Sequence, residues 1–438
     1  MHVRNELKLF VTCLAAVAAL GGCGGGIVNG GDVRLVNATN AFATLDLYDG
    51  STKISSGVGK NAAGAYVDLD KGSHTFNIAD GTTGVTTATL TGSVTKDDHF
   101  TIVAYTAGGT LATVFLSDDE GAPSSGTAKL RFFNAAPSAV ASVDAYLVAS
   151  ACSSLATSFS APIATSVSGL QATYAQANAT GAGTSYHICV TTAGDKTDLR
   201  LDIPAVTLKD QQIVTVILTP TDGGVLLNGL LLNQQSTLTA AANGSARIRL
   251  AVGAANSAAV TANVNGIALG TGLIAPSVGN YKIVPAGPLT IDMSVGGVVA
   301  TNVAGLTAAP GADLTLLVTG DATSAPVLIA DDNSASTSTT NPVKLRLVNG
   351  MKNGLPTGST AVLTDDFDNV GDGAMFGTAS AYAQVPSSAA LAHLEVTVGV
   401  TQICVSDTIT LTSGNVYTVF ILGDKPPAVT TCTLRLDR

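Results

Sequence analysis

The sequence has 438 residues and a formal net charge of −10, with only 12% charged residues, 47 glycines and no tryptophan. An acidic chain without a basic block disfavours nucleic acid as a partner. Many small residues and few charges are typical of short strands joined by tight turns, whereas a packed helical enzyme usually carries more Leu, Glu and Lys. We therefore expect an all-β protein with no nucleic-acid partner.

Residues 1–22 have the features of an export signal. Arg4 and Lys8 precede an apolar stretch that is shorter than the ~20 residues of a membrane-spanning helix. The motif Leu-Gly-Gly-Cys at residues 20–23 resembles the cleavage site of bacterial lipoproteins, where a peptidase cuts before the Cys and the thiol receives diacylglycerol. We predict a cleaved lipoprotein signal peptide and a membrane anchor through the lipid on Cys23. An ordinary secretory signal with a chance Cys is the alternative.

The expected location is the cell envelope, at the periplasmic or surface face of the outer membrane. Gly24 follows Cys23, so the Asp of an inner-membrane retention signal is missing. Residues 23–32 then form a Gly-rich tether between the lipid and the first strand.

One short strand motif occurs four times after the tether. Each copy places an Arg between two apolar residues, and in three copies an Asn follows three positions later. The four arginines are Arg34, Arg131, Arg249 and Arg346. Because side chains alternate along a strand, the apolar neighbours share one face. We expect the Arg on the other face, toward water, with its stem lying over the sheet.

The motif divides the mature chain into units of about 100 residues, the size of an immunoglobulin-like sandwich. We predict units 1 to 4 at residues 33–127, 128–243, 244–340 and 341–438. Each unit has several alternating strands with turn signals between them, and no stretch outside the signal has a helical period. The prediction is four tandem immunoglobulin-like β-sandwich domains.

Three further positions recur in the units. We interpret the Asn as a turn-capping side chain bonded to the backbone. A Tyr recurs as Tyr66, Tyr174, Tyr281 and Tyr382, and we expect a core residue whose hydroxyl reaches the rim. Paired aspartates follow the last strands of units 1 and 3, at residues 118–119 and 331–332, where we expect them to keep sheet edges soluble.

The order of these elements resembles a known family. An opening strand with Arg and Asn, a Val-Asp-x-Tyr strand, a Gly turn before an alternating strand, a buried strand and an Asp-Asp tail follow one another. This resembles the bacterial surface domain known only as domain of unknown function 4397 (DUF4397). Units 1 and 2 match best, since unit 3 lacks the Asn and unit 4 lacks the Val-Asp-x-Tyr strand. The resemblance implies an exported immunoglobulin-like sandwich, often in lipoproteins or cell-surface arrays, and implies no activity.

Four cysteines lie in the predicted units, namely Cys152, Cys189, Cys404 and Cys432. In an exported chain they indicate two disulfides, with three connectivities formally open. We predict Cys152–Cys189 and Cys404–Cys432, because each pair lies within one unit and Cys189 and Cys404 occupy similar strand positions. A metal site is the alternative, but no Cys-x-x-Cys pair supports it. We expect no metal and no other cofactor.

The sequence contains no motif of a catalytic centre. Gly-x-Ser-x-Gly, a phosphate-binding Gly-rich loop before a helix and His-Glu-x-x-His are all missing. Three of the four histidines beyond the signal, His74, His187 and His393, fall in equivalent strands of different units, where they cannot form one site; His99 is the fourth. We expect that the protein is not an enzyme.

An enlarged acidic loop in unit 4 is the first candidate for a binding loop. Its carboxylates are Asp365, Asp366, Asp368 and Asp372. Calcium binding is an alternative, since Ca²⁺ takes six to eight oxygen ligands. The spacing fails the helix–loop–helix calcium pattern, because Val370 occupies a ligand position and Gly377 stands where a Glu is needed. A solvated loop is the preferred interpretation.

Three functions remain open. The first is a non-catalytic, lipid-anchored envelope scaffold whose tandem sandwiches present a surface to an envelope protein or polymer. The second is a binding module for an envelope polysaccharide or a small ligand, which a cluster of exposed aromatic residues on one unit would favour. The third is an enzyme of unrecognised type, which a deep pocket with convergent titratable groups would favour. We expect the first.

Overall fold

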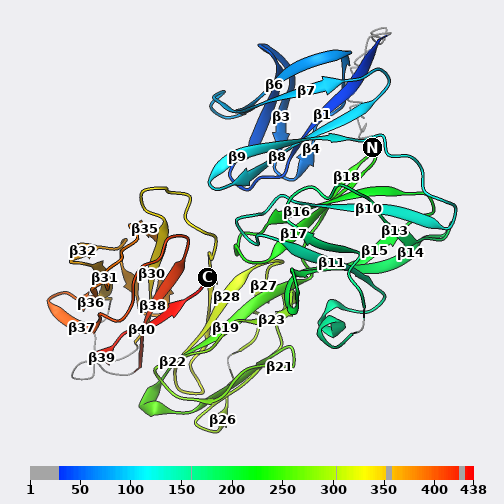
Figure 1. Ribbon diagram of the computed structural model, residues 1–438. Coiled ribbons are helices and arrows are strands. Elements are labelled where there is room, and N and C mark those ends of the chain that lie inside the picture. Colours follow the sequence, from blue (N-terminus) through cyan, green and yellow to red (C-terminus); the bar gives the residue numbers. More distant parts are fainter. Residues whose placement is uncertain (1–28, 159, 302, 352–357, 424–429) are drawn as a thin grey trace, which may run out of the picture.

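The computed structural model describes residues 29–158, 160–301, 303–351, 358–423 and 430–438. The predicted signal peptide and Cys23 lie outside these residues. The described chain forms four successive groups of strands, each of which contains two main sheets (Figure 1). We use unit 1 for β1–β9, unit 2 for β10–β18, unit 3 for β19–β29 and unit 4 for β30–β40. The predicted all-β fold of tandem β-sandwiches is confirmed.

In units 1 and 2, one sheet contains the Arg strand and the other forms the opposite layer. The Arg sheet of unit 1 has β1 (Gly30–Asn37), β4 (Ala62–Ala63), β5 (Val67–Asp70), β8 (His99–Ala107) and β9 (Thr110–Ser117), and the opposite sheet has β2 (Thr44–Asp49), β3 (Thr52–Gly59), β6 (Gly72–Asp80) and β7 (Thr86–Val94). Unit 2 has β10 (Thr127–Asn134), β13 (Ala175–Asn178), β16 (Ile213–Pro220), β17 (Leu227–Asn233) and β18 (Leu238–Ala241), against β11 (Val143–Val148), β12 (Ala164–Val167), β14 (Thr184–Thr192) and β15 (Asp195–Leu208).

Units 3 and 4 have the same two layers. Unit 3 has β19 (Ser245–Ala254), β22 (Ser277–Val278), β23 (Lys282–Pro285), β28 (Asp313–Gly320) and β29 (Val327–Asp331), against β20 (Val260–Val264), β21 (Ile267–Leu273), β25 (Ile291–Val295) and β26 (Val298–Val299), with a small pair β24 (Gly287–Pro288) and β27 (Thr307–Ala308). Unit 4 has β30 (Val343–Met351), β34 (Thr378–Ala379), β35 (Ala383–Val385), β38 (Val416–Gly423) and β40 (Thr433–Leu436), against β31 (Thr360–Asp365), β32 (Asp368–Asn369), β33 (Ala374–Met375), β36 (Leu394–Val398), β37 (Thr401–Ser406) and β39 (Thr430–Thr431).

Helical structure is limited to two 3₁₀ segments in the described chain, η1 (Cys152–Thr157) and η2 (Ala255–Ser257). No described helix has the length and apolar character needed to cross a bilayer.

The Arg strand of every unit lies beside a later strand of the same unit in parallel orientation. The pairs are β1–β8, β10–β16, β19–β28 and β30–β38. Both strands of a pair are almost wholly buried, which is typical of strands covered on two faces. One face therefore packs on the core of the unit, and the other must be covered by something else.

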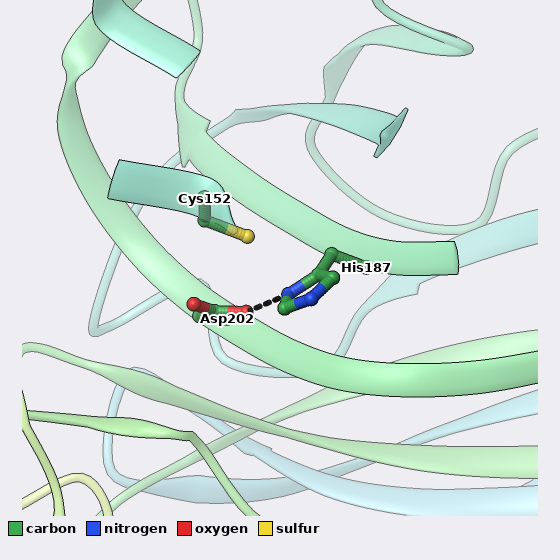
Figure 2. A group of neighbouring side chains, drawn as sticks. All are labelled: Cys152, His187 and Asp202. Atoms are coloured by element: carbon green, nitrogen blue, oxygen red, sulfur yellow. Dashed lines mark hydrogen bonds and ion pairs between the residues drawn. The ribbon is translucent and has the colours of Figure 1, made fainter. Parts of the chain in front are cut away.

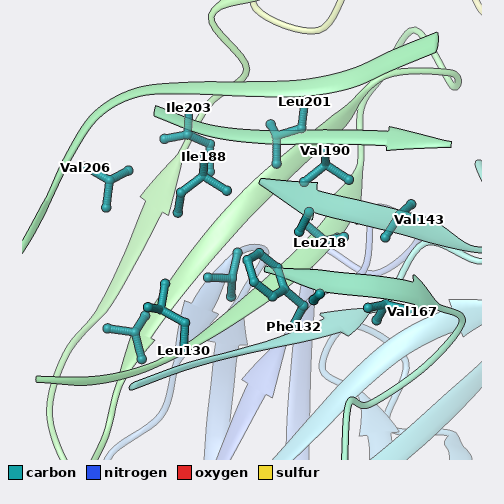
Figure 3. Packing of buried hydrophobic residues seen from close by; sticks show 14 of the residues in the cluster. Leu130, Phe132, Val143, Val167, Ile188, Val190, Leu201, Ile203, Val206 and Leu218 are labelled. Atoms are coloured by element: carbon teal, nitrogen blue, oxygen red, sulfur yellow. The ribbon is translucent and has the colours of Figure 1, made fainter. Parts of the chain in front are cut away.

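Each unit has its own apolar core between its two sheets. In unit 2, Leu130 and Phe132 of β10 meet Ile188 and Val190 of β14 and Leu201 of β15 (Figure 3). The cores of the other three units are built in the same way from alternating residues of their Arg strands and opposite sheets. The alternation seen in the sequence thus correctly predicts which residues face the core.

Two additional apolar clusters join the units in pairs. One contains Val36 and Val103 of unit 1 with Phe133 and Ile217 of unit 2. The second contains Ala251, Leu317 and Ile329 of unit 3 with Val348, Phe420 and Leu422 of unit 4. Unit 1 therefore packs its Arg sheet on the Arg sheet of unit 2, and unit 3 packs on unit 4 in the same manner.

The first strand begins earlier than the sequence predicted. β1 includes Gly30–Asp32, which we had placed in the tether at 23–32. Gly31 approaches the backbone so closely that a Cβ atom would lie 2.4 Å from the carbonyl oxygen of Thr95. The glycines here allow close packing in a strand, so the Gly-rich composition is not by itself the mark of a tether.

Candidate functional site

The four repeated arginines are buried, whereas the sequence analysis expected them to face water. Arg34 is 3% exposed, Arg131 is 8% exposed, and Arg249 and Arg346 are each 2% exposed. The parity of the strand is as predicted, because the apolar neighbours of each Arg lie in the core of its unit. The expectation was wrong about the opposite face, which is covered by the neighbouring unit rather than by solvent.

A Thr from the parallel neighbouring strand holds each Arg against its own sheet. The strand register pairs Arg34 with Thr101, Arg131 with Thr215, Arg249 with Thr315 and Arg346 with Thr418. In all four pairs the Arg Nε donates to the Thr Oγ1 over 2.8–3.2 Å. This hydrogen bond fixes the guanidinium and leaves its terminal nitrogens free to reach the next unit.

The recurring Tyr covers the guanidinium. The rings of Tyr66, Tyr174, Tyr281 and Tyr382 have their centroids 4.3–4.6 Å from the guanidinium carbons of Arg34, Arg131, Arg249 and Arg346. Such stacking is favourable for a desolvated cation. The Tyr therefore belongs to the arginine site. We had expected only a core residue at the rim and not a contact with the Arg.

Two of these phenols also donate to a carboxylate. The hydroxyl of Tyr66 lies 2.6 Å from Asp118, and that of Tyr281 lies 2.6 Å from Asp331. Burial, followed by the neighbouring carboxylate, raises the pKa of both phenols. Both hydroxyls therefore remain protonated donors at physiological pH.

Between units 3 and 4, the arginines exchange acidic partners. Arg249 of unit 3 forms a salt bridge with Asp437 of unit 4, and its Nη2 donates to Asp437 Oδ2 over 3.2 Å. Arg346 of unit 4 forms a salt bridge with Asp331 of unit 3, and Asp331 also lies 3.7 Å from Arg249. We call these four residues the arginine cluster of units 3 and 4. All four side chains are at least 98% buried.

Between units 1 and 2, the corresponding arginines, Arg34 and Arg131, donate across the junction to backbone carbonyl oxygens. Arg34 pairs with Asp118 of its own unit at 3.1 Å and donates across the junction to the carbonyl oxygen of Ser236 at 2.5 Å. Arg131 donates across to the carbonyl oxygen of Ser117 at 2.9 Å. We call Arg34, Arg131 and Asp118 the arginine cluster of units 1 and 2.

The aspartates after the last strands do not simply keep edges soluble, as we had expected. Asp118 and Asp331 are buried and neutralise arginines. The second Asp of each pair points elsewhere, and Asp332 is bound by Lys344 of unit 4 at 2.6 Å. The tails were misread because an Asp at a strand end looks the same in sequence whether water or another unit lies beyond it.

The recurring Asn caps the turn after its strand, as predicted. Asn37 donates to the carbonyl oxygens of Phe42 and Val58 and accepts from the backbone of Thr39. Asn134 and Asn349 make the equivalent bonds in units 2 and 4. These bonds occupy the amides with local backbone and leave nothing for a ligand.

The acidic loop of unit 4 is built around a tight hairpin turn. Asp365 pairs with Asp368 across the turn, and the two residues between them have positive φ angles of 46° and 73°. Burial, and then the adjacent Asp366 and Asp368, raises the pKa of Asp365. Within the described residues, Asp365, Asp366, Asp368 and Asp372 do not bring three ligand atoms within 4.8 Å of one another.

Unit 4 also exposes two phenylalanine rings, one of which lies in this turn. Phe367 is 77% exposed, and its ring lies 5.0 Å from that of His393. Phe376 is also exposed, but it follows β33, which pairs with the opposite end of β31 from the hairpin turn. The two exposed rings therefore belong to separate parts of the unit.

His74 and His187 lie in the equivalent strands β6 and β14, and His393, which we expected in a strand, comes just before β36. His74 pairs with Asp49, His187 with Asp202 and His393 with Asp407. His99 lies between Asp32 and Asp119 at the edge of unit 1. The structure thus places these titratable groups in four separate sites.

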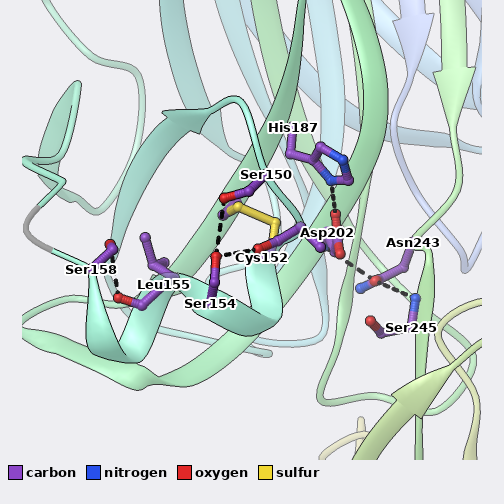
Figure 4. The surroundings of a disulfide bond; sticks show 11 residues. Ser150, Cys152, Ser154, Leu155, Ser158, His187, Asp202, Asn243 and Ser245 are labelled. Atoms are coloured by element: carbon purple, nitrogen blue, oxygen red, sulfur yellow. Dashed lines mark hydrogen bonds and ion pairs between the residues drawn. A yellow bond between two sulfur atoms is a disulfide. The ribbon is translucent and has the colours of Figure 1, made fainter.

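The structure contains disulfides between Cys152 and Cys189 and between Cys404 and Cys432. These are the predicted pairs, and two structural disulfides are compatible with an extracytoplasmic protein. Cys152 begins η1 (Figure 4). Cys189 lies on the face of β14 that is turned away from the core of unit 2, because its neighbours Ile188 and Val190 belong to that core. His187 and Asp202 lie beside this first disulfide (Figure 2).

A cavity of ≈ 890 Å³ lies where several units meet. Its wall includes Asn40 of unit 1, Thr221 of unit 2, Ser336 of the segment between units 3 and 4, and Arg438 after β40. Thr106 also lines it, and the buried Oγ1 of this Thr has no hydrogen-bond partner in the described chain. Sequence analysis missed the cavity because its wall combines segments that are far apart in the chain.

Comparison with known proteins adds little about chemistry. No curated protein matches the sequence. Among solved structures, the Bacillus anthracis TIE protein matches with 11% identity and a TM-score of 0.14, covering 93% of this chain and 69% of that one. A carbohydrate-binding module of family CBM26 from Eubacterium rectale Amy13K, solved with maltoheptaose, matches with 9% identity and a TM-score of 0.14, covering 44% of this chain and 92% of that one.

A family model matches the first part of the chain. The match covers residues 31–146, which begin at the second residue of β1, contain the rest of unit 1 and β10 of unit 2, and end within β11. The matched residues include the Arg34 and Arg131 motifs that carry the resemblance described above. Residues 31–146 therefore match the family described as Domain of unknown function (DUF4397), as the sequence predicted.

Proposed function

We propose that the protein is a non-catalytic, lipid-anchored scaffold of the cell envelope, which holds four sandwiches in a fixed arrangement and presents their loops to an envelope protein or polymer. The observation that carries the proposal is the use of the recurring polar residues. The Arg, Thr, Tyr and Asp that repeat along the chain bind one another at the junctions between units. What repeats is therefore the means of joining sandwiches.

The buried charge clusters support a fixed arrangement rather than a flexible string of domains. Separating a buried guanidinium from its carboxylate costs several kcal/mol of free energy, so hinge motion at a junction held by such a pair is unfavourable. The apolar clusters around Phe133 and Phe420 add burial on the same faces. Surface loops carried by such a rigid body are well placed to bind partners.

The anchor and the rigidity can be tested separately. The Cys23→Ser variant should move from the membrane fraction to the soluble fraction, whereas a wild-type protein that is already soluble would contradict the lipid anchor. In the soluble variant, spin labels on cysteines introduced at Ser51 and Val400, both exposed, report the distance between units 1 and 4. We expect one narrow distance distribution; a broad one would overturn the rigid scaffold.

The cavity favours a second candidate, a binding module for a small ligand or envelope oligosaccharide. Its volume of ≈ 890 Å³ is in the usual range for small-molecule sites. Filling it by Ala139→Trp should abolish any thermal stabilisation that envelope oligosaccharides give the wild type. If no oligosaccharide shifts the wild-type transition, the scaffold remains the better proposal.

A further inference from the structure

The surroundings of the first disulfide contain the donor set of a metal site. Cys152 Sγ, a ring nitrogen of His187 and a carboxylate oxygen of Asp202 all lie within 4.8 Å of one another (Figure 2). In a tetrahedral zinc site the ligand atoms are ~3.3–3.8 Å apart, as follows from metal–ligand bonds of ~2.0–2.3 Å. The three atoms are therefore close to the spacing that one zinc ion requires.

A fourth donor is covalently attached to this group. Cys189 is bonded to Cys152, and the Cα atoms of the two residues are 5.6 Å apart. Cys189 follows His187 by two positions on β14, so both side chains leave the same face of the strand. The strand register places Asp202 directly opposite Cys189. The three mutually close donors thus come from η1, β14 and β15, and the sulfur of Cys189 is bonded to one of them.

Neighbouring residues hold two of the donors in place. His187 Nδ1 lies 3.1 Å from Asp202 Oδ1. The backbone of Asp202, in the middle of β15, is bound by the segment before β19. Its N–H donates to Asn243 Oδ1 at 3.2 Å (Figure 4), and its carbonyl accepts from the N–H of Gly244 at 2.7 Å. Positioning contacts of this kind are what orient the ligands of metal sites.

The sulfur side of the site is shielded from water, whereas His187 and Asp202 are partly exposed. Cys152 and Cys189 are 3% and 0% exposed and pack with Tyr146, Leu155 and Leu199, and Ile283 of unit 3 covers the group. A dry surround strengthens the attraction between a cation and thiolate ligands. Because Ile283 belongs to unit 3, the site lies against that unit, and binding of a metal would change the contact between units 2 and 3.

We propose that the Cys152–Cys189 disulfide and a zinc ion are alternative closures of unit 2. A dithiol reductant transfers two electrons and two protons to the disulfide, which gives two protein thiols and the cyclic disulfide of the reductant. One Zn²⁺ then displaces the two thiol protons and is bound by Cys152, Cys189, His187 and Asp202. The oxidised form has no thiolate and binds no zinc. The site thus retains metal in the reduced chain. When a disulfide oxidant accepts two electrons from the two thiolates and becomes a dithiol, the Cys152–Cys189 bond forms again and Zn²⁺ is released.

The second disulfide provides a matched control. Cys404 and Cys432 are joined in the same way, but no group of three possible metal ligands surrounds them in the described chain. Reduction opens both disulfides, yet only the first should bind metal. A Cys404→Ser/Cys432→Ser variant therefore keeps the proposed site and removes the other two thiols.

Cobalt titration of the soluble Cys23→Ser protein tests the proposal. The protein is reduced with dithiothreitol, desalted without oxygen and titrated with Co²⁺, whose thiolate charge-transfer and d–d bands report tetrahedral sulfur ligation. We expect one Co²⁺ per chain in the reduced protein and in its Cys404→Ser/Cys432→Ser variant, displacement of Co²⁺ by Zn²⁺, and no thiolate bands in the oxidised protein. Absence of the bands from the reduced protein, or their loss in the Cys404→Ser/Cys432→Ser variant, would overturn the proposal.

His187→Ala tests the nitrogen ligand without removing a thiol. Its fold can be verified by circular dichroism while both disulfides are intact. After reduction, we expect the Co²⁺ affinity to fall at least about tenfold, as seen when even the supporting contacts of metal ligands are removed. An unchanged affinity and unchanged d–d bands would show that the imidazole is not a ligand and would refute the four-residue site.

Discussion

The two arginine clusters start from the same strand motif and neutralise their charges differently. Between units 3 and 4, Arg249 and Arg346 face two carboxylates, each supplied by the other unit. Between units 1 and 2, Asp118 is the one carboxylate of the described chain that pairs with either arginine, and it serves the Arg34 of its own unit, whereas Arg131 forms no salt bridge within the described chain. The junction of units 1 and 2 therefore depends on backbone acceptors, and the junction of units 3 and 4 depends on exchanged charges.

The difference follows from what comes after the last long strand of each unit. Units 1, 3 and 4 carry an Asp there, whereas in unit 2 β17 ends at Asn233 and Gln234 follows it. Gln234 instead binds the backbone of Glu120 through both ends of its amide. The apolar residue two positions after the Arg also differs between the junctions. It is Phe133 in unit 2 and the smaller Val348 in unit 4. One repeated motif thus permits two chemically distinct junctions.

The largest effect is expected when Asp331 is changed to Asn. This carboxylate serves Arg346 and lies beside Arg249, so its loss leaves two buried guanidiniums with one remaining acid. Breaking a buried ion pair in this way lowers the free energy of unfolding by about 3–5 kcal/mol. Urea denaturation followed by circular dichroism measures it.

Asp222→Asn is the control for that change. Its carboxylate is 94% exposed and lies 3.5 Å from Lys60, so we expect a change within about 0.5 kcal/mol. If Asp331→Asn were as mild as Asp222→Asn, the exchanged charges would not hold units 3 and 4 together.

An intermediate effect is expected for Arg131→Met. The Met replaces the stem of the Arg and leaves no carboxylate unpaired, but the carbonyl oxygen of Ser117 loses its donor. The buried hydroxyl of Thr215 also loses the donor Nε of Arg131, and an unsatisfied buried acceptor costs about 1–3 kcal/mol. Arg249→Met should be more destabilising, because it leaves Asp437 without its partner. The reverse order of the two variants in urea midpoint would contradict the difference between the junctions.

The smallest effect concerns a pair that both junctions share. Lys344 binds Asp332 between units 3 and 4, as Lys129 binds Glu120 between units 1 and 2. Burial alone would raise the pKa of Asp332, but hydrogen bonds from Lys344 and Ser334 together lower it. Because half of the Asp332 side chain is exposed, we expect Asp332→Asn to lower the free energy of unfolding by less than about 1 kcal/mol.

The pH dependence of this last effect has a definite sign. A carboxyl group whose pKa is lower in the folded state stabilises the fold above its unfolded pKa of about 3.9, and the contribution is lost as the pH falls through the folded value. The difference between wild type and Asp332→Asn should therefore shrink when urea unfolding is repeated at progressively lower pH below 4. A difference that grew on acidification would mean that Asp332 is not held by a cation.

The sequence predicted the fold where short-range patterns decide it. Alternation placed Leu35 and Phe132 in their cores, and the Asn after the strand indicated the turn that it caps. The cysteine positions indicated both disulfides. Each of these inferences needs only residues within one unit, whose order along the chain limits what can meet.

Contacts between units could not be predicted in the same way. Alternation shows that Arg249 leaves the core face, but it does not show what lies beyond that face. Its partner Asp437 is 188 positions away, and no local pattern relates the two. One signal was present, because every Arg has a Thr at the matching register of the buried strand. An Arg–Thr pair that recurs on otherwise apolar strands indicates a surface that is buried against another unit rather than exposed to solvent.

The exchange of aspartates also sets an order of events in biosynthesis. Arg34 meets Asp118 once 84 further residues have been made, and unit 1 then holds its own charge pair. Arg249 has Asp331 of its own unit at 3.7 Å, but the carboxylate to which it is hydrogen-bonded is Asp437, which a ribosome adding ~5–20 residues per second reaches only ~10–40 s after Arg249. The amino-terminal half can mature one sandwich at a time, whereas the carboxy-terminal half has to close as a pair.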